Sequence, residues 1–450
     1  MGAVGEHAVV IGGSVGGLVA ARVLSDRFTR VTIVDRDVLP REARDRRAVP
    51  QGGHAHALLI GGQTALEDLF PGLTDELAAG GAVLCDPGSD LLFHHLGALR
   101  VRFPSGRLSV TCSRAFLEHT LRGRVTALAN VAVRDRTTAR GLTGAAGAVT
   151  GVELEDGEVL AADLVVDATG RGGGTDGWLE QVGCEAPAAV TVKVDVAYTT
   201  RLLRRAPGER LLDDGLLYLM ATAPPHDKRA AVVFPVEGDR WIVTLGGWHG
   251  SRAPVGSEGF AAFAAGLPAP HVADLLARAR PVDDGDARRI TFPQARRRHF
   301  ERLRRPPAGH VSLGDAVCSF NPIYGQGMTV AALEAQELGR CLDRFGTASS
   351  RMARAYYRAA AGVIDTPWRM ATGGDFMYPE TVGPRPAGTG LVNRYVRQVV
   401  LASHVSVDAH RVLLDVQHLL APPSALLRPA TVVRSLAAAR RSPARRQGGR

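Results

Sequence analysis

The sequence predicts an α/β fold in which a Rossmann-like parallel sheet is interleaved with an antiparallel β-sheet domain and followed by a helical C-terminal region. Three observations lead to this prediction. An apolar run and a glycine-rich turn precede a helical pattern at 8–24, residues 190–250 alternate as strands do, and the chain after 327 has helical spacing. We expect the parallel-sheet domain at 6–184 and 291–345, the antiparallel domain at 185–290, helices at 346–439 and a disordered basic tail at 440–450.

The first glycine-rich turn has the context of a dinucleotide-binding site. Gly12 permits a tight turn, Ser14 is small enough for the backbone to approach a pyrophosphate, and Gly17 lets the helix pack closely against the strand. The phosphates would lie on free N–H groups at the helix N-terminus. We therefore assign phosphate contacts to Gly12, Gly13, Ser14, Val15, Gly16 and Gly17. A second strand ends at Asp35, whose carboxylate can accept hydrogen bonds from ribose hydroxyls.

A second glycine-rich segment distinguishes FAD from NAD. Gly314 allows a turn at the end of a buried strand, and Asp315 can hydrogen-bond a ribityl hydroxyl, which a nicotinamide dinucleotide lacks. The run 325–327 then opens a helix whose N–H groups can stabilise the negative charge of a reduced flavin. Together, the two segments predict FAD.

Composition narrows the class of protein further. The 450 residues, 45% of them hydrophobic and 22% charged, are ordinary for a globular protein of two or three domains. Most of the net charge of +9 comes from six arginines between 434 and 450, so nucleic-acid binding is not expected. The five cysteines are scattered without metal-site spacing, and we expect no metal. The absence of a signal peptide or long apolar stretch favours a cytoplasmic protein without a transmembrane segment.

The chain between the glycine segments predicts further elements. Residues 36–56 form a long loop rich in arginine, proline and glycine, which is typical of a functional loop. Three strand-like runs at 131–133, 149–154 and 164–167 predict a meander that returns to the parallel sheet.

These residues resemble the class A flavoprotein monooxygenases with the aromatic-hydroxylase type of FAD fold. The matching positions are the phosphate turn, Asp35-Arg36, Arg114, and the segment with Asp315, Pro322, Gly325 and Gly327. A narrower resemblance, carried by stretches such as 49–56, 167–172 and 320–325, is to actinobacterial flavin epoxidases of polyether biosynthesis, such as the monensin and lasalocid epoxidases. For the cofactor we therefore assign further contacts to Arg36, Arg47, Gln51, Arg114, Gly314, Asp315, Pro322, Gly325, Gln326, Gly327 and Met328.

The resemblance implies that reduced FAD reacts with O2 to a C4a-hydroperoxide, which epoxidises an alkene or hydroxylates an apolar secondary metabolite. The flavin supplies the chemistry, so we expect an apolar pocket that excludes water and we name no catalytic side chain. The substrate is either free or tethered to a carrier. The pocket candidates are His56, Tyr198, Phe234, Trp248, Phe320, Tyr324 and Trp368.

Several alternatives remain open. Aromatic hydroxylases usually carry Asp-Gly after the third strand, where this chain has 168–170, Ala-Thr-Gly. NAD(P)H therefore reduces the flavin either directly or through a separate flavin reductase. An isoprenoid double-bond reductase of the same fold and a non-catalytic flavoprotein docking module are the rival functions. A flavin halogenase is not expected, because the four tryptophans are never two residues apart.

Overall fold

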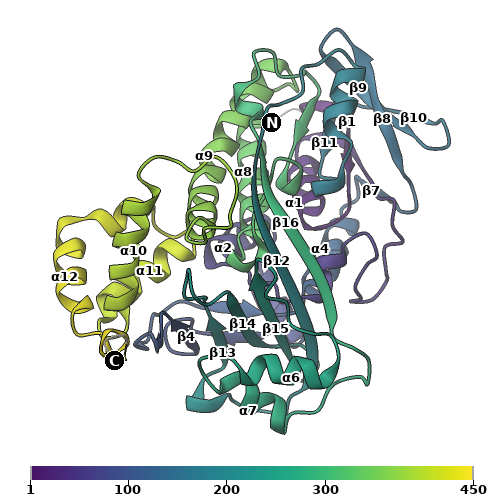
Figure 1. Cartoon of the computed structure of the whole chain (residues 1–450). Coiled ribbons are helices and arrows are strands. Elements are labelled where there is room, and N and C mark those ends of the chain that lie inside the picture. The colour runs from purple at the N-terminus through teal and green to yellow at the C-terminus, as the bar shows by residue number, and fades with distance from the viewer. Residues whose placement is uncertain (1–2, 448–450) are drawn as a thin grey trace.

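The computed structural model describes residues 3–447 and contains the predicted parallel sheet (Figure 1). This sheet has the order β17-β11-β1-β2-β7, with every pair parallel. Its strands are β1 (Gly5–Ile11), β2 (Phe28–Val34), β7 (Val131–Arg134), β11 (Leu164–Asp167) and β17 (His310–Ser312). The second halves of the central strands are mostly apolar because both faces of the sheet are covered there; Ala8, Val9 and Val10 are fully buried.

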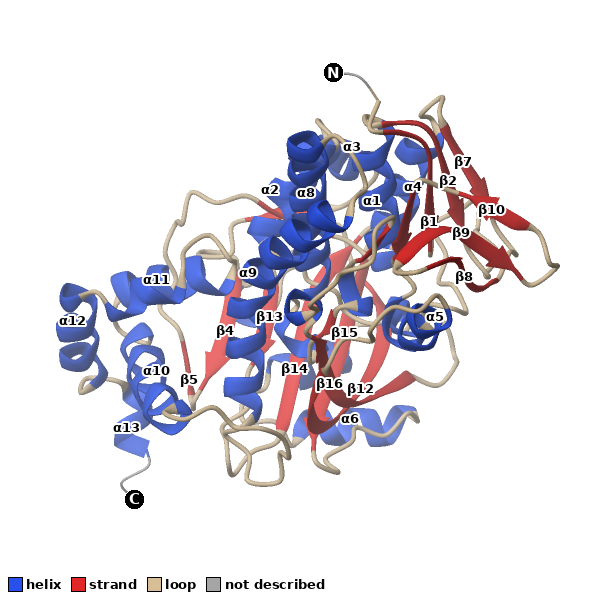
Figure 2. Ribbon diagram, turned by 90° about the horizontal axis from the view of Figure 1, so that it is seen from above, coloured by secondary structure: helices blue, strands red, loops and turns tan. Residues whose placement is uncertain are grey.

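Helices pack on the parallel sheet and around it (Figure 2). They are α1 (Val15–Ser25), α2 (Ile60–Leu69), α3 (Leu73–Ala79), α4 (Arg114–Thr126), α5 (Thr175–Gln181), α8 (Gly327–Phe345) and α9 (Ser350–Asp375). Helices α1 and α8 pack together, and Gly339 of α8 makes their approach possible because a Cβ there would lie 3.0 Å from Val23 Cγ1. Gly346, with φ of 61°, ends α8 in the left-handed conformation that helix C-termini favour.

The antiparallel meander differs from the sequence prediction. Its strands are β8 (Ala139–Ala145), β9 (Ala148–Leu154) and β10 (Val159–Ala161). The runs at 131–133 and 164–167 belong to the parallel sheet instead, as β7 and β11. Periodicity could not assign the run at 164–167, because a strand buried on both faces has no alternation, and the run at 131–133 is too short to show any period.

An eight-stranded sheet forms the second layer, in the order β18-β16-β12-β15-β14-β13-β4-β5. Its strands are β4 (Leu91–His95), β5 (Ala98–Leu99), β12 (Ala189–Arg204), β13 (Leu217–Met220), β14 (Arg229–Val236), β15 (Arg240–Trp248), β16 (Arg288–Arg298) and β18 (Cys318–Ser319). A two-stranded sheet of β3 (Val83–Cys85) and β6 (Ser109–Thr111) and the helices α6 (Ser257–Ala265) and α7 (His271–Arg278) complete the region. The second sheet therefore extends beyond 185–290, since strands from both flanking segments form its edges.

The C-terminal region is helical and lies beside β4 (Figure 1). It contains α10 (Thr389–Ser403), α11 (Val407–Gln417), α12 (Pro429–Ala439) and α13 (Pro443–Gln447). The predicted disordered tail is wrong over 440–447: Ser442 is fully buried and hydrogen-bonds His404, with 2.7 Å between Ser442 Oγ and His404 Nδ1. The rest of that tail lies outside the described residues. Within residues 3–447, no helix is long and apolar enough to cross a membrane.

The mixed α/β architecture confirms the predicted fold class. Short 3-10 helices connect several elements around the junction of the two layers. Those used below are η1 (Pro50–Gly53), η2 (Gly170–Gly172), η5 (Gly314–Ala316) and η6 (Pro322–Tyr324).

Candidate functional site

A cavity of about 1910 Å³ lies where the parallel sheet, the eight-stranded sheet and the C-terminal helices meet. Pockets for one small ligand typically enclose roughly 300–1,000 Å³, so this cavity has room for a large cofactor and a substrate. The predicted cofactor residues that line it are Ser14, Val15, Gly16, Arg36, Gln51, Arg114, Gly314, Asp315, Pro322, Gly325, Gln326, Gly327 and Met328. The two glycine segments, about 300 residues apart, therefore open into one space.

The turn after β1 has the geometry of a phosphate cradle. Gly12 adopts φ of +107°, and a Cβ on Gly17 would lie 1.7 Å from the Gly12 carbonyl oxygen. Ser14, the residue before α1, forms no hydrogen bond from its side chain to the helix N-terminus. The first N–H groups of α1 are thus left for an anion, as in known phosphate-binding turns.

The Ser14 hydroxyl instead connects the turn to α4. It donates to Glu118 Oε2 at 2.6 Å and accepts from Arg114 Nη2 at 2.8 Å. Serine at the second glycine position of the motif is therefore compatible with the turn and gives it a hydrogen bond that glycine could not.

Asp35 stabilises the turn from the end of β2. Its Oδ2 accepts from the Gly13 N–H at 2.7 Å and from Arg46 Nη1 at 3.2 Å, and its Oδ1 accepts from the Asp37 N–H at 2.8 Å. Gly12, Gly13, Gly17 and Asp35 do not line the cavity wall. The contact of Asp35 with the ribose stays a prediction; in the structure its carboxylate holds the backbone of the turn and Arg46, and the adjacent Arg36 is exposed in the cavity wall.

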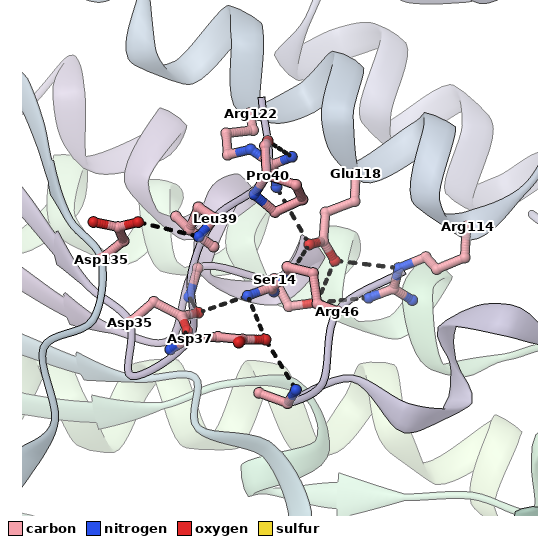
Figure 3. Close-up of polar contacts among 12 residues, drawn as sticks. Ser14, Asp35, Asp37, Leu39, Pro40, Arg46, Arg114, Glu118, Arg122 and Asp135 are labelled. Atoms are coloured by element: carbon pink, nitrogen blue, oxygen red, sulfur yellow. Dashed lines mark hydrogen bonds and ion pairs between the residues drawn. The ribbon is translucent and has the colours of Figure 1, made fainter. Parts of the chain in front are cut away.

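A buried ionic cluster underlies the same turn (Figure 3). Arg46 Nε donates to Glu118 Oε1 at 2.7 Å, and Arg114 and Arg122 also approach Glu118, at 3.6 and 3.5 Å. The predicted residue Arg47 is exposed and does not line the cavity, whereas its neighbour Arg46 is buried. Neither arginine lines the cavity, so a contact of Arg47 with the cofactor stays a prediction; nothing local in the sequence shows which of the two adjacent side chains is buried.

The second glycine segment forms the facing wall. Gly314 adopts φ of +66° after β17, and its N–H donates to Glu334 Oε2 at 2.7 Å. Among the described residues, no group donates a hydrogen bond to the Asp315 carboxylate, which is free to accept one from a ligand. Burial raises the pKa of Asp315, and the nearby charges of Arg171, Arg114 and Arg296 oppose that rise.

Helix α8 begins at this wall. Gly325, with φ of +64°, turns the chain after η6, and the residue that precedes the helix, Gln326, forms no hydrogen bond from its side chain to the helix N-terminus. The buried Oε1 of Gln326 has no partner among the described residues. The cavity thus fits a dinucleotide whose phosphates lie at α1 and whose flavin lies at α8. The features that fit are the two glycine turns, the uncapped helix N-termini and the unpartnered polar groups.

The predicted substrate residues form the remaining walls. His56, Tyr198, Phe234, Trp248, Phe320, Tyr324 and Trp368 all line the cavity. Burial, followed by the charge of Arg114, lowers the pKa of His56 to about 3. Because His56 Nδ1 lies 2.9 Å from the His54 carbonyl oxygen, Nδ1 carries the proton of this neutral ring.

A buried carboxylate behind these aromatics was missed from the sequence. Asp375 Oδ1 accepts from Asn321 Nδ2 at 2.8 Å, and from Trp248 Nε1 and the Tyr324 hydroxyl at 3.3 Å each. Burial raises the pKa of Asp375 to about 6 against these hydrogen bonds. The neighbouring Gly374 leaves room for this contact, since a Cβ there would lie 2.3 Å from the Tyr324 hydroxyl oxygen.

Comparison with known proteins gave one curated relative and many structures of similar fold. Protein Rv3254 of Mycobacterium tuberculosis is 35% identical over 414 residues, which cover 85% of this chain and 84% of the relative. No protein-family model matches the chain.

Two solved structures illustrate the fold. A flavoprotein/dehydrogenase from Cytophaga hutchinsonii has a TM-score of 0.67 at 16% identity, covering 96% of this chain and 98% of its own. PqsL of Pseudomonas aeruginosa, described as "a probable FAD-dependent monooxygenase", has a TM-score of 0.60 at 20% identity, covering 83% of this chain and 97% of its own. The chain therefore belongs to the family of Protein Rv3254 of Mycobacterium tuberculosis and has the fold of class A flavin monooxygenases.

Proposed function

We propose that this protein is an FAD-dependent monooxygenase that inserts one oxygen atom from O2 into an apolar small-molecule substrate. The observation that carries the proposal is the single cavity that joins a phosphate cradle at α1, a flavin cradle at α8 and a wall of aromatic side chains. The similarity to PqsL supports the same function through the shared fold.

Different residues of the cavity would bind different parts of the cofactor. The N–H groups at the start of α1 would hold the pyrophosphate, with Arg36 beside the adenosine, and Asp315 would accept from the ribityl chain. The N-terminus of α8 would face the pyrimidine edge of the flavin. When bound, FAD supplies the electrons that activate O2.

The aromatic wall would orient the substrate and exclude water. Tyr198, Trp248 and Tyr324 are held in place through Asn321 and Asp375, since Tyr198 donates to Asn321 Oδ1 at 2.6 Å. Fixed apolar walls protect a reactive oxygen donor from hydrolysis and present one face of the substrate. This arrangement suits alkene epoxidation or hydroxylation of an apolar secondary metabolite, with NAD(P)H as electron source directly or through a separate flavin reductase.

The cofactor assignment is tested by measuring bound FAD in Asp315→Ala and Gly17→Val, with Asp408→Ala on the exposed face of α11 as the matched control. We expect both site variants to lose FAD while the control retains it. Unchanged FAD in both site variants would refute the assignment.

The reaction class is tested separately with FAD-loaded protein, reduced anaerobically and then mixed with ¹⁸O2 and a panel of alkenes and phenols. Mass spectrometry of the products should show one ¹⁸O atom. A product that gains two hydrogen atoms and no oxygen would instead identify a double-bond reductase.

A further inference from the structure

One buried arginine in the cavity wall has no carboxylate partner within residues 3–447. Arg100 follows β5, is 3% exposed and lines the cavity at the edge of the eight-stranded sheet. Its Nη1 donates to Gln417 Oε1 at 2.9 Å, and its Nη2 donates to His95 Nδ1 at 3.0 Å. Its buried Nε has no partner among the described residues. A guanidinium has five N–H donors, so three are left without an acceptor in the part of the chain that the structure describes.

The groups around Arg100 do not neutralise its charge. His95, His404 and His410 each have a pKa that burial lowers, so these rings are neutral at pH 7. The phenyl ring of Phe93 lies 3.6 Å from the guanidinium carbon. Burial lowers the pKa of Arg100 to about 9, which still leaves it charged at neutral pH. A buried charge without a counterion is costly to the folded protein, and a bound anion would offset that cost.

Apart from neutral polar groups such as His95, His410 and Gln417, the cavity near this charge has apolar walls. Leu96 and Phe93 from the sheet edge and Val400, Leu413 and Leu414 from α10 and α11 line the same region. The wall that carries Gly325 lies across the same cavity from Arg100. A Cβ on Gly325 would lie 3.9 Å from Leu59 Cδ2, the next residue Ile60 donates its N–H to His418, and Gln417 beside it accepts from Arg100. A molecule that extends from Arg100 to the wall at Gly325 would therefore contact these apolar side chains along its length.

We propose that Arg100 binds the carboxylate of an elongated apolar acid whose other end reaches the flavin segment. This proposal rests on the monooxygenase function above and specifies its substrate as a free acid. A thioester on a carrier protein has no carboxylate to pair with Arg100, so the geometry favours a free substrate over a tethered one. Arg100 is then a specificity-determining residue.

The test measures binding to the full-length protein by calorimetry, with and without FAD. Decanoate and 2-naphthoate are the anionic probes, and methyl decanoate, methyl 2-naphthoate and S-decanoyl-N-acetylcysteamine are their neutral counterparts. We expect at least one carboxylate to bind at least about tenfold more tightly than its neutral counterparts, as charge-assisted hydrogen bonds at a buried site would produce. Equal affinity in both series would overturn the proposal.

Variants separate a binding role from a structural one. In Arg100→Met and Arg100→Gln, the preference for carboxylate should fall below about threefold, while Arg100→Lys should retain part of it. Arg107→Met is the matched control, because Arg107 is an exposed arginine of the same region that pairs with Asp415 at 3.4 Å. A carboxylate preference that persists in both Arg100→Met and Arg100→Gln would overturn the proposal.

Two further outcomes are informative. Displacement of decanoate by millimolar inorganic phosphate in wild type, but not in Arg100→Gln, would assign the site to a phosphate group and overturn the carboxylate proposal. Failure of the protein to load FAD would refute the proposed oxygenase function, while the comparison of acid and ester in the FAD-free protein would still decide the role of Arg100.

Discussion

Replacement of Gly17 by alanine tests the phosphate cradle with one methyl group. The added Cβ would lie 1.7 Å from the Gly12 carbonyl oxygen and 2.8 Å from its carbonyl carbon, whereas ordinary contacts are 3.4–4 Å. The turn and α1 must therefore separate by about 1.7 Å. Overpacking of this kind typically costs about 1–3 kcal/mol of stability. The shift would also break hydrogen bonds from the turn to a bound phosphate, each worth about 1.5–3 kcal/mol.

We therefore expect Gly17→Ala to weaken FAD binding about 10- to 100-fold, measured by quenching of flavin fluorescence on titration with protein. Gly123→Ala is the matched control, since a Cβ there has open space within α4 and should leave FAD affinity unchanged. Wild-type FAD affinity in a folded Gly17→Ala protein would refute the placement of the phosphates at this turn.

Three other variants test the buried polar groups. Burial raises the pKa of Asp375 to about 6, so between about pH 4 and pH 6 the native state keeps a proton that the unfolded state has released. The contribution of Asp375 to the free energy of unfolding therefore falls as pH rises through this range. We therefore expect the free energy of unfolding of Asp375→Asn, measured in urea and taken relative to wild type at the same pH, to increase by up to about 3 kcal/mol from pH 4 to pH 7. A difference between the two proteins that does not change with pH would contradict this. Glu118→Gln removes the carboxylate that Arg46, Arg114 and Arg122 share, and leaves Arg46 paired with Asp35. The variant should lower the free energy of unfolding by about 3–5 kcal/mol; a loss below about 1 kcal/mol would argue against the cluster. Ser442→Ala removes the hydrogen bond to His404 and should cost about 1 kcal/mol, whereas no change would show that the tail adds nothing to stability.

The parallel-sheet part of the fold was predictable because its signals are local. An apolar strand, a glycine turn and a helical pattern follow one another within about 20 residues, and the structure places them as β1, the turn and α1. The second sheet was only partly predictable. Strand β4 pairs in parallel with β13, more than 100 residues later, and no local pattern reveals such a pairing.

The site residues also divide into those with a local sequence signal and those whose position depends on long-range contacts. The glycine segments could be found because their conformations restrict the sequence, as Gly12 and Gly325 show with positive φ. Arg100 and Asp375 could not be found, because a lone charged residue gives no sign of burial until the fold encloses it. Their roles depend on the long-range contacts of β5 and α9.

The central claim is that one cavity holds both halves of FAD, and the most direct measurement compares FAD and FMN binding to flavin-free protein. FMN lacks the adenylate that would lie at the α1 turn, but keeps the flavin and ribityl chain that would contact Asp315. The account predicts one FAD per chain, bound at least about tenfold more tightly than FMN. Equal affinity for the two flavins, or no binding of either, would contradict it.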